Sequence, residues 1–218
     1  PYIVPLGLYL VGTSLLSSFP QNYALGYAAV AIVVAASLVW SLRGRELVRT
    51  HRQVGGAVAV GLVGILLWLG LSSLGLERQV AQWLPAFLRP SDRPGFNPWQ
   101  ELPTDSWSVA FVVVRLVGLV VLVPVAEELF WRGFLWRWLQ DPDWERQPIG
   151  QWHRGAFFGV TALFTLAHPE WFAAAVYGAL IGLLLVWKRD LWLCIVAHAT
   201  SNFVLGIYIL GTHSWQLW

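Results

Sequence analysis

The sequence is poor in charge and cysteine, and it contains no methionine. Only 12% of its 218 residues are charged, about half of the fraction that is usual in soluble domains, whereas 57% are hydrophobic. This scarcity of charge excludes an ordinary soluble domain and predicts an integral membrane protein. Cys194 is the single cysteine, which excludes an internal disulfide. Because the chain begins at Pro1 and has no methionine, we expect it to be trimmed or excerpted from a longer polypeptide.

Basic residues are also scarce, and they form no run that would indicate a nucleic-acid partner. Lys188 is the only lysine among the 14 lysine and arginine residues, and the formal net charge is +2. The common sequence signatures of zinc proteases are missing too, since there is no His-Glu-x-x-His segment and no pair of cysteines.

Seven apolar stretches each approach the length that a helix needs to cross about 30 Å of hydrocarbon. They cover roughly residues 2–18, 23–41, 54–75, 107–139, 154–168, 171–187 and 190–211. The first has no basic region before it and no cleavage site after it, so we interpret it as a span and not as a signal peptide. The predicted fold class is all-α, a polytopic membrane helix bundle with about seven transmembrane helices.

Basic residues divide unevenly between the two alternating sets of loops in this arrangement. The richer set holds Arg43, Arg45, Arg49, Arg52, Arg132, Arg137, Arg146, Arg154, Lys188 and Arg189, the poorer set holds Arg78, Arg89 and Arg93, and Arg115 belongs to neither. Since basic loops favour the cytoplasmic side, the richer set is predicted inside and both termini outside.

The longest outer connection, residues 77–106, is too long for a simple turn. Its apolar residues recur at helical spacing and predict a short amphipathic helix lying in the membrane interface, although Pro85 interrupts the pattern. These residues are Val80, Trp83, Leu84, Phe87 and Leu88. Two glycine pairs further along, Gly155 with Gly159 and Gly178 with Gly182, predict close helix packing in the second half of the chain.

Two adjacent carboxylates, Glu127 and Glu128, lie with Arg132 inside the fourth apolar stretch. Ionised groups at such a depth cost several kcal/mol unless they are paired or hydrated, so they predict a functional site. Glu128 and Arg132 are four residues apart and can pair on one helix face, whereas Glu127 is rotated by about 100° and left for another role. A simple salt bridge at a helix end beside a solvated Glu127 explains the same pattern.

Three further polar residues, His168, His198 and Asn202, lie in the later apolar stretches. At 1.5 Å of rise per residue, they and Glu127 can all reach the middle to inner part of the membrane. Pro169 biases His168 away from helix, and a helix broken at depth implies space lined by protein or water. Either histidine alone would suit a packing role, but the constellation predicts one shared polar cavity.

Three motifs follow one another on successive spans, Glu-Glu-x-x-x-Arg at 127–132, Phe-x-x-x-His at 164–168 and His-x-x-x-Asn at 198–202. Together they resemble the motifs of the CAAX protease and bacteriocin-processing (CPBP) family of intramembrane endopeptidases, which includes the type II CAAX prenyl endopeptidase. The resemblance covers about residues 107–211. It implies that residues 107–218 form the catalytic bundle and that residues 1–106 add the N-terminal spans and the outer loop with its interfacial helix, within one structural unit.

The resemblance implies that the chain is an intramembrane glutamic-type protease, which hydrolyses a peptide bond through a glutamate-activated water. Glu127 would take the proton from a water held with His168, and His198 and Asn202 would donate hydrogen bonds to the oxyanion. The supporting residues would be Glu128, Arg132 and Phe164. No cofactor and no metal is implied, and the partners would be the lipid bilayer and a membrane-associated protein or peptide.

The opening Pro1–Pro5 segment and the many tryptophans resemble the bacterial branch found alongside exosortase-type protein-sorting systems. This resemblance implies a bacterial inner membrane, with the active site opening toward its cytoplasmic half. Neither the substrate nor the oligomeric state follows from the sequence.

Three other interpretations stay open. Glu127, His168 and His198 could form a zinc site with a water in the fourth position. The chain could also be a non-catalytic scaffold or an immunity-type protein of the same fold. A transporter with a proton relay is less compatible, because the polar residues are all in one half and the halves show no repeat.

Overall fold

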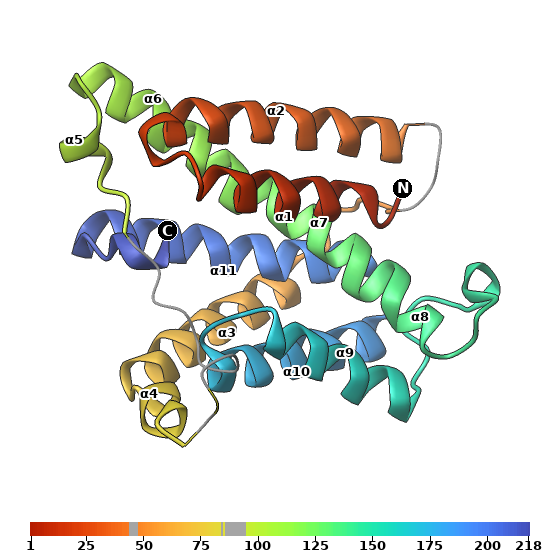
Figure 1. Ribbon diagram of the computed structural model, residues 1–218. Helices are drawn as coiled ribbons and strands as arrows, with labels where there is room; N and C mark the ends of the chain where they lie inside the picture. The colour runs from red at the N-terminus through yellow and green to blue at the C-terminus, as the bar shows by residue number, and fades with distance from the viewer. Residues whose placement is uncertain (44–47, 84, 86–94) are drawn as a thin grey trace.

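The computed structural model describes residues 1–43, 48–83, 85 and 95–218, and every regular element in these ranges is a helix (Figure 1). The predicted all-α membrane bundle is confirmed. Within these ranges, five helices are long and apolar enough to cross a membrane. They are α2 (Tyr23–Leu42), α3 (Gly55–Ser73), α10 (Trp171–Lys188), α11 (Leu191–Thr212) and a continuous helix from Asp105 to Trp138.

The first and fifth predicted spans are shorter than expected. Their helices, α1 (Val4–Leu16) and α9 (Arg154–Leu166), have 13 residues each and so extend about 20 Å. Both are apolar, but neither meets the length of a full crossing. The predicted count of seven transmembrane helices is therefore not confirmed, and the fold has five long helices with two short apolar ones beside them.

The helix from Asp105 to Trp138 is interrupted by two π-helical segments. It consists of α6 (Asp105–Val117), η3 (Gly118–Leu122), α7 (Val123–Glu128), η4 (Leu129–Leu135) and α8 (Trp136–Trp138), with π-helical geometry in η3 and η4. Such wide turns are rare and are frequent at functional sites. They flank α7, which carries the two adjacent carboxylates.

Small residues let α3 pack closely against two later helices. A methyl group on Gly61 would overlap the Ala197 carbonyl of α11, and one on Gly64 would lie 2.6 Å from the Tyr177 ring of α10. The buried cluster that fills the bundle accordingly joins Ala57 of α3 to Ala197 and to Trp136 of the long helix. The N-terminal helices thus share a core with the polar second half.

The predicted glycine packing is confirmed for one pair of glycines. Gly178 and Gly182 of α10 face the rings of Phe164 and Phe157 in α9, which lie 3.1 and 3.2 Å from where a Cβ would stand. The other pair does not join two transmembrane helices. Among the residues that the structure describes, a Cβ on Gly155 would lie within 4 Å of its neighbour His153 alone, and one on Gly159 would lie within 4 Å of the Leu139 side chain alone, just after α8.

Outward faces of the long helices are strongly apolar. Ile32 on α2, Leu66 on α3 and Leu183 on α10 are 70%, 69% and 53% exposed. Large hydrophobic side chains exposed on this scale have a favourable environment in lipid and an unfavourable one in water. The short remaining elements are η1 (Pro20–Asn22), α4 (Leu76–Ala81), α5 (Pro98–Glu101), η5 (Trp144–Arg146) and η6 (Trp215–Leu217).

Two expectations drawn from the basic residues are wrong. The chain termini lie at opposite ends of the bundle and not on one side (Figure 1). Arg132, which was counted with the loops, lies inside the long helix and is 0% exposed. Its charge is balanced by the neighbouring turn of its own helix, so it carries no information about loop orientation.

The predicted interfacial helix is present only in part. Helix α4 starts before Val80 and ends at Ala81, and Val80 and Trp83 are exposed. Leu84, Phe87 and Leu88 lie outside the described residues. Glu77 in α4 is buried, and its Oε1 accepts a hydrogen bond from the backbone N–H of Phe172, 3.1 Å away, which ties α4 to the start of α10.

Candidate active site

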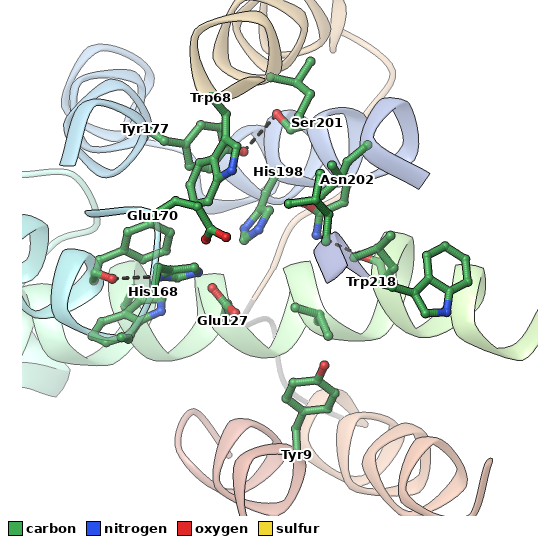
Figure 2. A pocket seen from close by; sticks show the side chains of 18 of the residues that line it. Tyr9, Trp68, Glu127, His168, Glu170, Tyr177, His198, Ser201, Asn202 and Trp218 are labelled. Carbon is green, nitrogen blue, oxygen red and sulfur yellow. Dashed lines mark hydrogen bonds between the residues drawn. The ribbon is translucent and has the colours of Figure 1, made fainter. Parts of the chain in front are cut away.

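A cavity of about 330 Å³ opens between the long helix and α1, α3, α9, α10 and α11. Four predicted catalytic residues line it, Glu127, His168, His198 and Asn202, together with the supporting Phe164. Figure 2 shows the polar side chains of the first four gathered around this space. The predicted convergence of distant polar residues on one cavity is thus what the fold produces.

Glu127 reaches the cavity from α7, between the two π-helical segments. Its carboxylate points into the space toward which His168 and His198 also project (Figure 2). One carboxylate oxygen, Oε2, is buried and accepts no hydrogen bond from the described part of the chain. A buried acceptor of this kind is costly in a fold unless it serves a ligand, a water or a proton.

His168 is held at the end of the short helix α9. Helix α9 ends at Leu166, and the Nδ1 atom of His168 lies 2.8 Å from the carbonyl oxygen of Phe164. A carbonyl can only accept, so Nδ1 carries the proton and Nε2 has the free lone pair. The imidazole stacks against the Phe164 ring with centroids 4.3 Å apart, while the edge-on Trp68 ring lies 5.6 Å away.

Glu128 and Arg132 form the predicted ion pair, and His198 joins it. Arg132 Nη1 and His198 Nδ1 lie 3.1 and 2.8 Å from the same Glu128 oxygen, Oε1. Both Glu128 and Arg132 are 0% exposed and stand behind the wall of the cavity. Arg132 also donates to the Gly178 carbonyl at 3.3 Å. Glu128 therefore fixes the His198 ring, and the opposite ring nitrogen, Nε2, remains for the cavity.

Asn202 donates a hydrogen bond to a backbone carbonyl oxygen that has no donor within its own helix. In segment η3 the N–H of Val123 bonds to the Gly118 carbonyl five residues earlier. The next donor in that pattern would be residue 124, a proline without an N–H, so the Leu119 carbonyl lacks its helical partner. Asn202 Nδ2 donates to this oxygen at 2.9 Å. One of the two amide hydrogens of Asn202 is thereby used and the other is left.

Polar residues beside His198 continue the network into α3. The Tyr177 hydroxyl donates to Ser201 Oγ at 3.0 Å, and Ser201 donates to the Gly61 carbonyl at 2.8 Å. The edge of the Tyr177 ring also faces His198, with centroids 5.7 Å apart. Neither Tyr177 nor Ser201 was singled out from the sequence, because each is an ordinary residue in an apolar helix.

Other lining residues were also missed by sequence reasoning, namely Tyr9, Trp68, Arg115, Glu170 and Trp218. Arg115 did leave a signal, since it is a charge in the middle of an apolar stretch and fits neither set of loops. It is 8% exposed, and its guanidinium lies over the Tyr27 ring at 4.3 Å. Glu170 immediately precedes α10 and lines the same cavity.

The geometry gives no support to a zinc site. Across the described ranges, no three histidine, cysteine, aspartate or glutamate side chains are grouped so that they could hold a metal ion. Glu127, His168 and His198 therefore share the cavity without forming a ligand set.

Comparison with known families gives one match. Residues 108–204 match the family described as type II CAAX prenyl endopeptidase Rce1-like. No curated protein and no solved structure matches the chain. The matched segment extends from α6 into α11 and contains all three motifs, and the family is one of proteases. The exosortase-associated branch is not tested and stays a prediction. Motifs, helical fold and family match together show an integral membrane protein whose residues 108–204 are similar to the type II CAAX prenyl endopeptidase family of membrane proteases.

Proposed function

We propose that the protein is an intramembrane endopeptidase that hydrolyses a peptide bond of a membrane-associated substrate with a water activated by Glu127. One observation carries the proposal. A carboxylate whose buried oxygen accepts no hydrogen bond from the described residues and two imidazoles with committed Nδ1 atoms meet in a single cavity within an apolar bundle. Each group is oriented by the fold, and each has one atom left for chemistry.

The first step is proton removal from water. Glu127 accepts one proton, and His168 Nε2 accepts a hydrogen bond from the other water hydrogen, so the water oxygen is aimed at the substrate carbonyl. General bases positioned in this way typically contribute about 10²- to 10⁴-fold in rate. The new C–O bond gives a tetrahedral oxyanion, and Glu127 then returns its proton to the leaving amine as the C–N bond breaks.

The second contribution is stabilisation of the oxyanion. Asn202 offers its remaining amide hydrogen, and His198 offers Nε2–H when its ring is protonated, with Glu128 compensating the charge. A preorganised donor of this kind contributes about 3–4 kcal/mol to the barrier. Arg132 holds Glu128 in place through their ion pair, and Phe164 supports the His168 ring by stacking.

The cellular setting belongs to the same proposal. We place the protein in the bacterial inner membrane, as the resemblance implies, with the site opening toward the cytoplasmic half. A substrate that lies in or on the bilayer suits a cavity whose surroundings are apolar. The arginine-rich loops near Arg43 and Arg154 support this orientation.

The test compares wild type with Glu127→Gln on a pool of N-acylated peptides in detergent, with Glu101→Gln as the control. Glu101 is an exposed glutamate of α5 that does not line the cavity. We expect Glu127→Gln to lose at least about 10²-fold in rate with an unchanged melting temperature, because the substitution removes only the base. A parallel sample contains a metal chelator.

Three results would contradict the proposal. Undiminished cleavage by Glu127→Gln would show that Glu127 is not the general base. Loss of wild-type cleavage in the presence of the chelator would favour metal chemistry. If wild type, Glu101→Gln and Glu127→Gln all cleave no peptide, the result would favour a non-catalytic scaffold.

A further inference from the structure

Trp68 of α3 contacts the ring of His168 from a different helix. It lines the cavity and is half-buried, and the two ring centroids lie 5.6 Å apart with the ring planes at 76°. Such edge-on contacts are a favoured geometry between aromatic rings. In the described part of the chain, no other ring from outside residues 108–204 lies against either proposed catalytic imidazole. Trp68 is thus a contact of the site that the family match does not contain.

Local groups alone would leave His168 less firmly held than His198. The hydrogen bond of His168 and its stacking partner both come from Phe164, one turn earlier in the same segment. Helix α9 ends at Leu166, so no further helical turn follows to fix the backbone of His168. His198 lies within α11, and its Nδ1 is bonded to Glu128. Of the two imidazoles, His168 therefore depends more on a contact from another helix.

The indole ring of Trp68 also rests against Tyr177 of α10. Their centroids lie 5.8 Å apart at 83°, and Tyr177 is in turn edge-on to His198 at 5.7 Å. Tyr177 is fixed, because its hydroxyl donates to Ser201 Oγ at 3.0 Å. Figure 2 shows Trp68 beside Tyr177, with His168 and His198 projecting into the same cavity. Trp68 therefore joins His168 to the fixed side chains around His198.

The backbone of α3 determines how far Trp68 reaches into the site. Gly61, Gly64 and Trp68 follow at spacings of three and four residues, which places them on one helix face. At Gly61 this face meets the backbone of α11, and at Gly64 it meets the Tyr177 ring. Since both glycines bring α3 close to its neighbours, the indole one turn later lies against His168 at the cavity wall.

We propose that Trp68 is a positioning residue of the hydrolysis, which holds the His168 ring at a fixed place relative to His198. This inference rests on the proposed function. Trp68 accepts no proton and forms no bond to the substrate. Its ring keeps His168 Nε2 aimed at the water, while Tyr177 and Glu128 keep His198 at the oxyanion. A misplacement of about 1 Å between such groups can reduce a rate by about 10²-fold.

Trp192 provides a matched comparison for Trp68. Both are half-buried tryptophans packed against the buried cluster that fills the bundle. Trp192 does not line the cavity, and no ring contact in the described ranges joins it to an imidazole. Its Nε1 donates to the His51 carbonyl at 2.9 Å. Replacing Trp192 removes a similar apolar contact and a hydrogen bond as well, so it should destabilise the fold at least as much as a change at Trp68.

The experiment measures cleavage of the N-acylated peptide pool by the full chain in detergent. Wild type is compared with Trp68→Leu, Trp68→Phe and Trp192→Leu, and the two leucine variants are repeated in a His168→Ala background. Melting temperatures report the stability of every variant. If Trp68→Leu does not fold, Trp68→Met takes its place, because a flexible methionine side chain fills irregular space without supplying a ring.

We expect Trp68→Leu to lower kcat by about 10²-fold and to leave KM within about 3-fold, because the water and not the substrate loses its place. Trp68→Phe keeps a ring and should recover about 10-fold of that loss. In the His168→Ala background, Trp68→Leu should cost less than about 3-fold, since the ring that Trp68 positions is gone. Trp192→Leu should change kcat by less than about 3-fold in either background.

The tautomer of His168 provides a test that does not depend on cleavage. It is read by NMR from the ring nitrogens of isotope-labelled histidine, and His168→Ala identifies the signal among the five histidines. Wild-type His168 should show one tautomer, with the proton on Nδ1, because that nitrogen bonds to a backbone carbonyl. Trp68→Leu should give averaged signals, and Trp192→Leu should keep the single tautomer. His198 should be unaffected by both changes, since Glu128 holds it.

The inference fails on any of three outcomes. An equal loss of rate from Trp68→Leu in both backgrounds would show that Trp68 does not act through His168. An equal loss from Trp192→Leu would show a general loosening of the bundle. An unchanged rate or an unchanged His168 signal in Trp68→Leu would show that Phe164 alone holds the ring. If wild type and variants cleave no peptide but Trp68→Leu still frees the His168 ring, the proposed hydrolysis fails and the positioning contact stands.

Discussion

Asn202 has two tasks that compete for the same side-chain amide. One N–H supports the Leu119 carbonyl, whose helical donor is missing because residue 124 is a proline. The other N–H is the proposed donor to the oxyanion. The structural bond holds the amide in the orientation that the catalytic bond requires, so Pro124 takes part in building the site without lining it.

The two tasks can be separated with a pair of substitutions. Asn202→Ala should lower the free energy of unfolding by about 1–3 kcal/mol, because it orphans the Leu119 carbonyl, and should also slow cleavage by about 10²-fold. Adding Pro124→Ala supplies the missing backbone N–H and should recover the stability but not the rate. Chemical denaturation and cleavage of one peptide pool measure the two effects. Recovery of the rate in the double variant would show that Asn202 has only the structural task.

Sequence reasoning succeeded for side chains whose neighbours are local. The ion pair of Glu128 with Arg132 follows from i,i+4 spacing in one helix, and it is confirmed. The shared cavity was predictable because isolated polar groups are costly in lipid. The bond from His198 to Glu128 and the placement of Arg115 beside Tyr27 depend on which helices pack together, and no local pattern contains that information.

Among the helices, the contact of α3 with α11 has the greatest influence on the site. At their closest approach, Gly61 faces the backbone of Ala197, the residue before His198. Ser201, one turn later, donates to the Gly61 carbonyl at 2.8 Å. Because the obstructing atom is a backbone oxygen, the space at Gly61 cannot be enlarged by a side-chain rotation.

Gly61→Ala should therefore push the two helices apart and displace His198. Overpacking of this kind destabilises by about 1–3 kcal/mol, and a displacement near 1 Å can reduce the rate by about 10²-fold. Gly70→Ala in the same helix is the control, since no atom of the described ranges lies within 4 Å of its added methyl group. This control should be neutral or stabilising by up to about 1 kcal/mol. Equal melting temperatures and rates for both variants would rule out a tight α3–α11 contact.

The presence of each long helix could be predicted from the length of its apolar stretch. Which helices pack against one another could not. The stretches at 23–41, 54–75, 171–187 and 190–211 correspond to α2, α3, α10 and α11 within a few residues. The stretches at 2–18 and 154–168 gave shorter helices because serines follow α1 and Pro169 follows α9. Hydropathy also gave no hint that α3, from the half without motifs, packs against both α10 and α11.

The entire chain, and not only its family-matched segment, is needed to enclose the cavity. Residues 108–204 contain all the motif residues. The wall nevertheless includes Leu6 and Tyr9 from α1 and Ile65 and Trp68 from α3. Without these helices the Tyr177 ring and the Ser201 hydroxyl would lose their contacts with Gly64 and Gly61, and the polar groups around His198 would face lipid.

Residues 95–218 expressed alone should therefore cleave the peptide pool no faster than full-length Glu127→Gln. Coexpression of residues 1–94 should restore both copurification of the two fragments and cleavage, because α3 can then fill the groove beside α11. The physical reason is that polar side chains are stable at membrane depth only when protein surrounds them. Full activity of residues 95–218 alone would mean that the second half encloses its own cavity and that α1 and α3 serve only to cover it from lipid. Restored copurification without cleavage would instead show that the helices must be joined in one chain to set the position of His198.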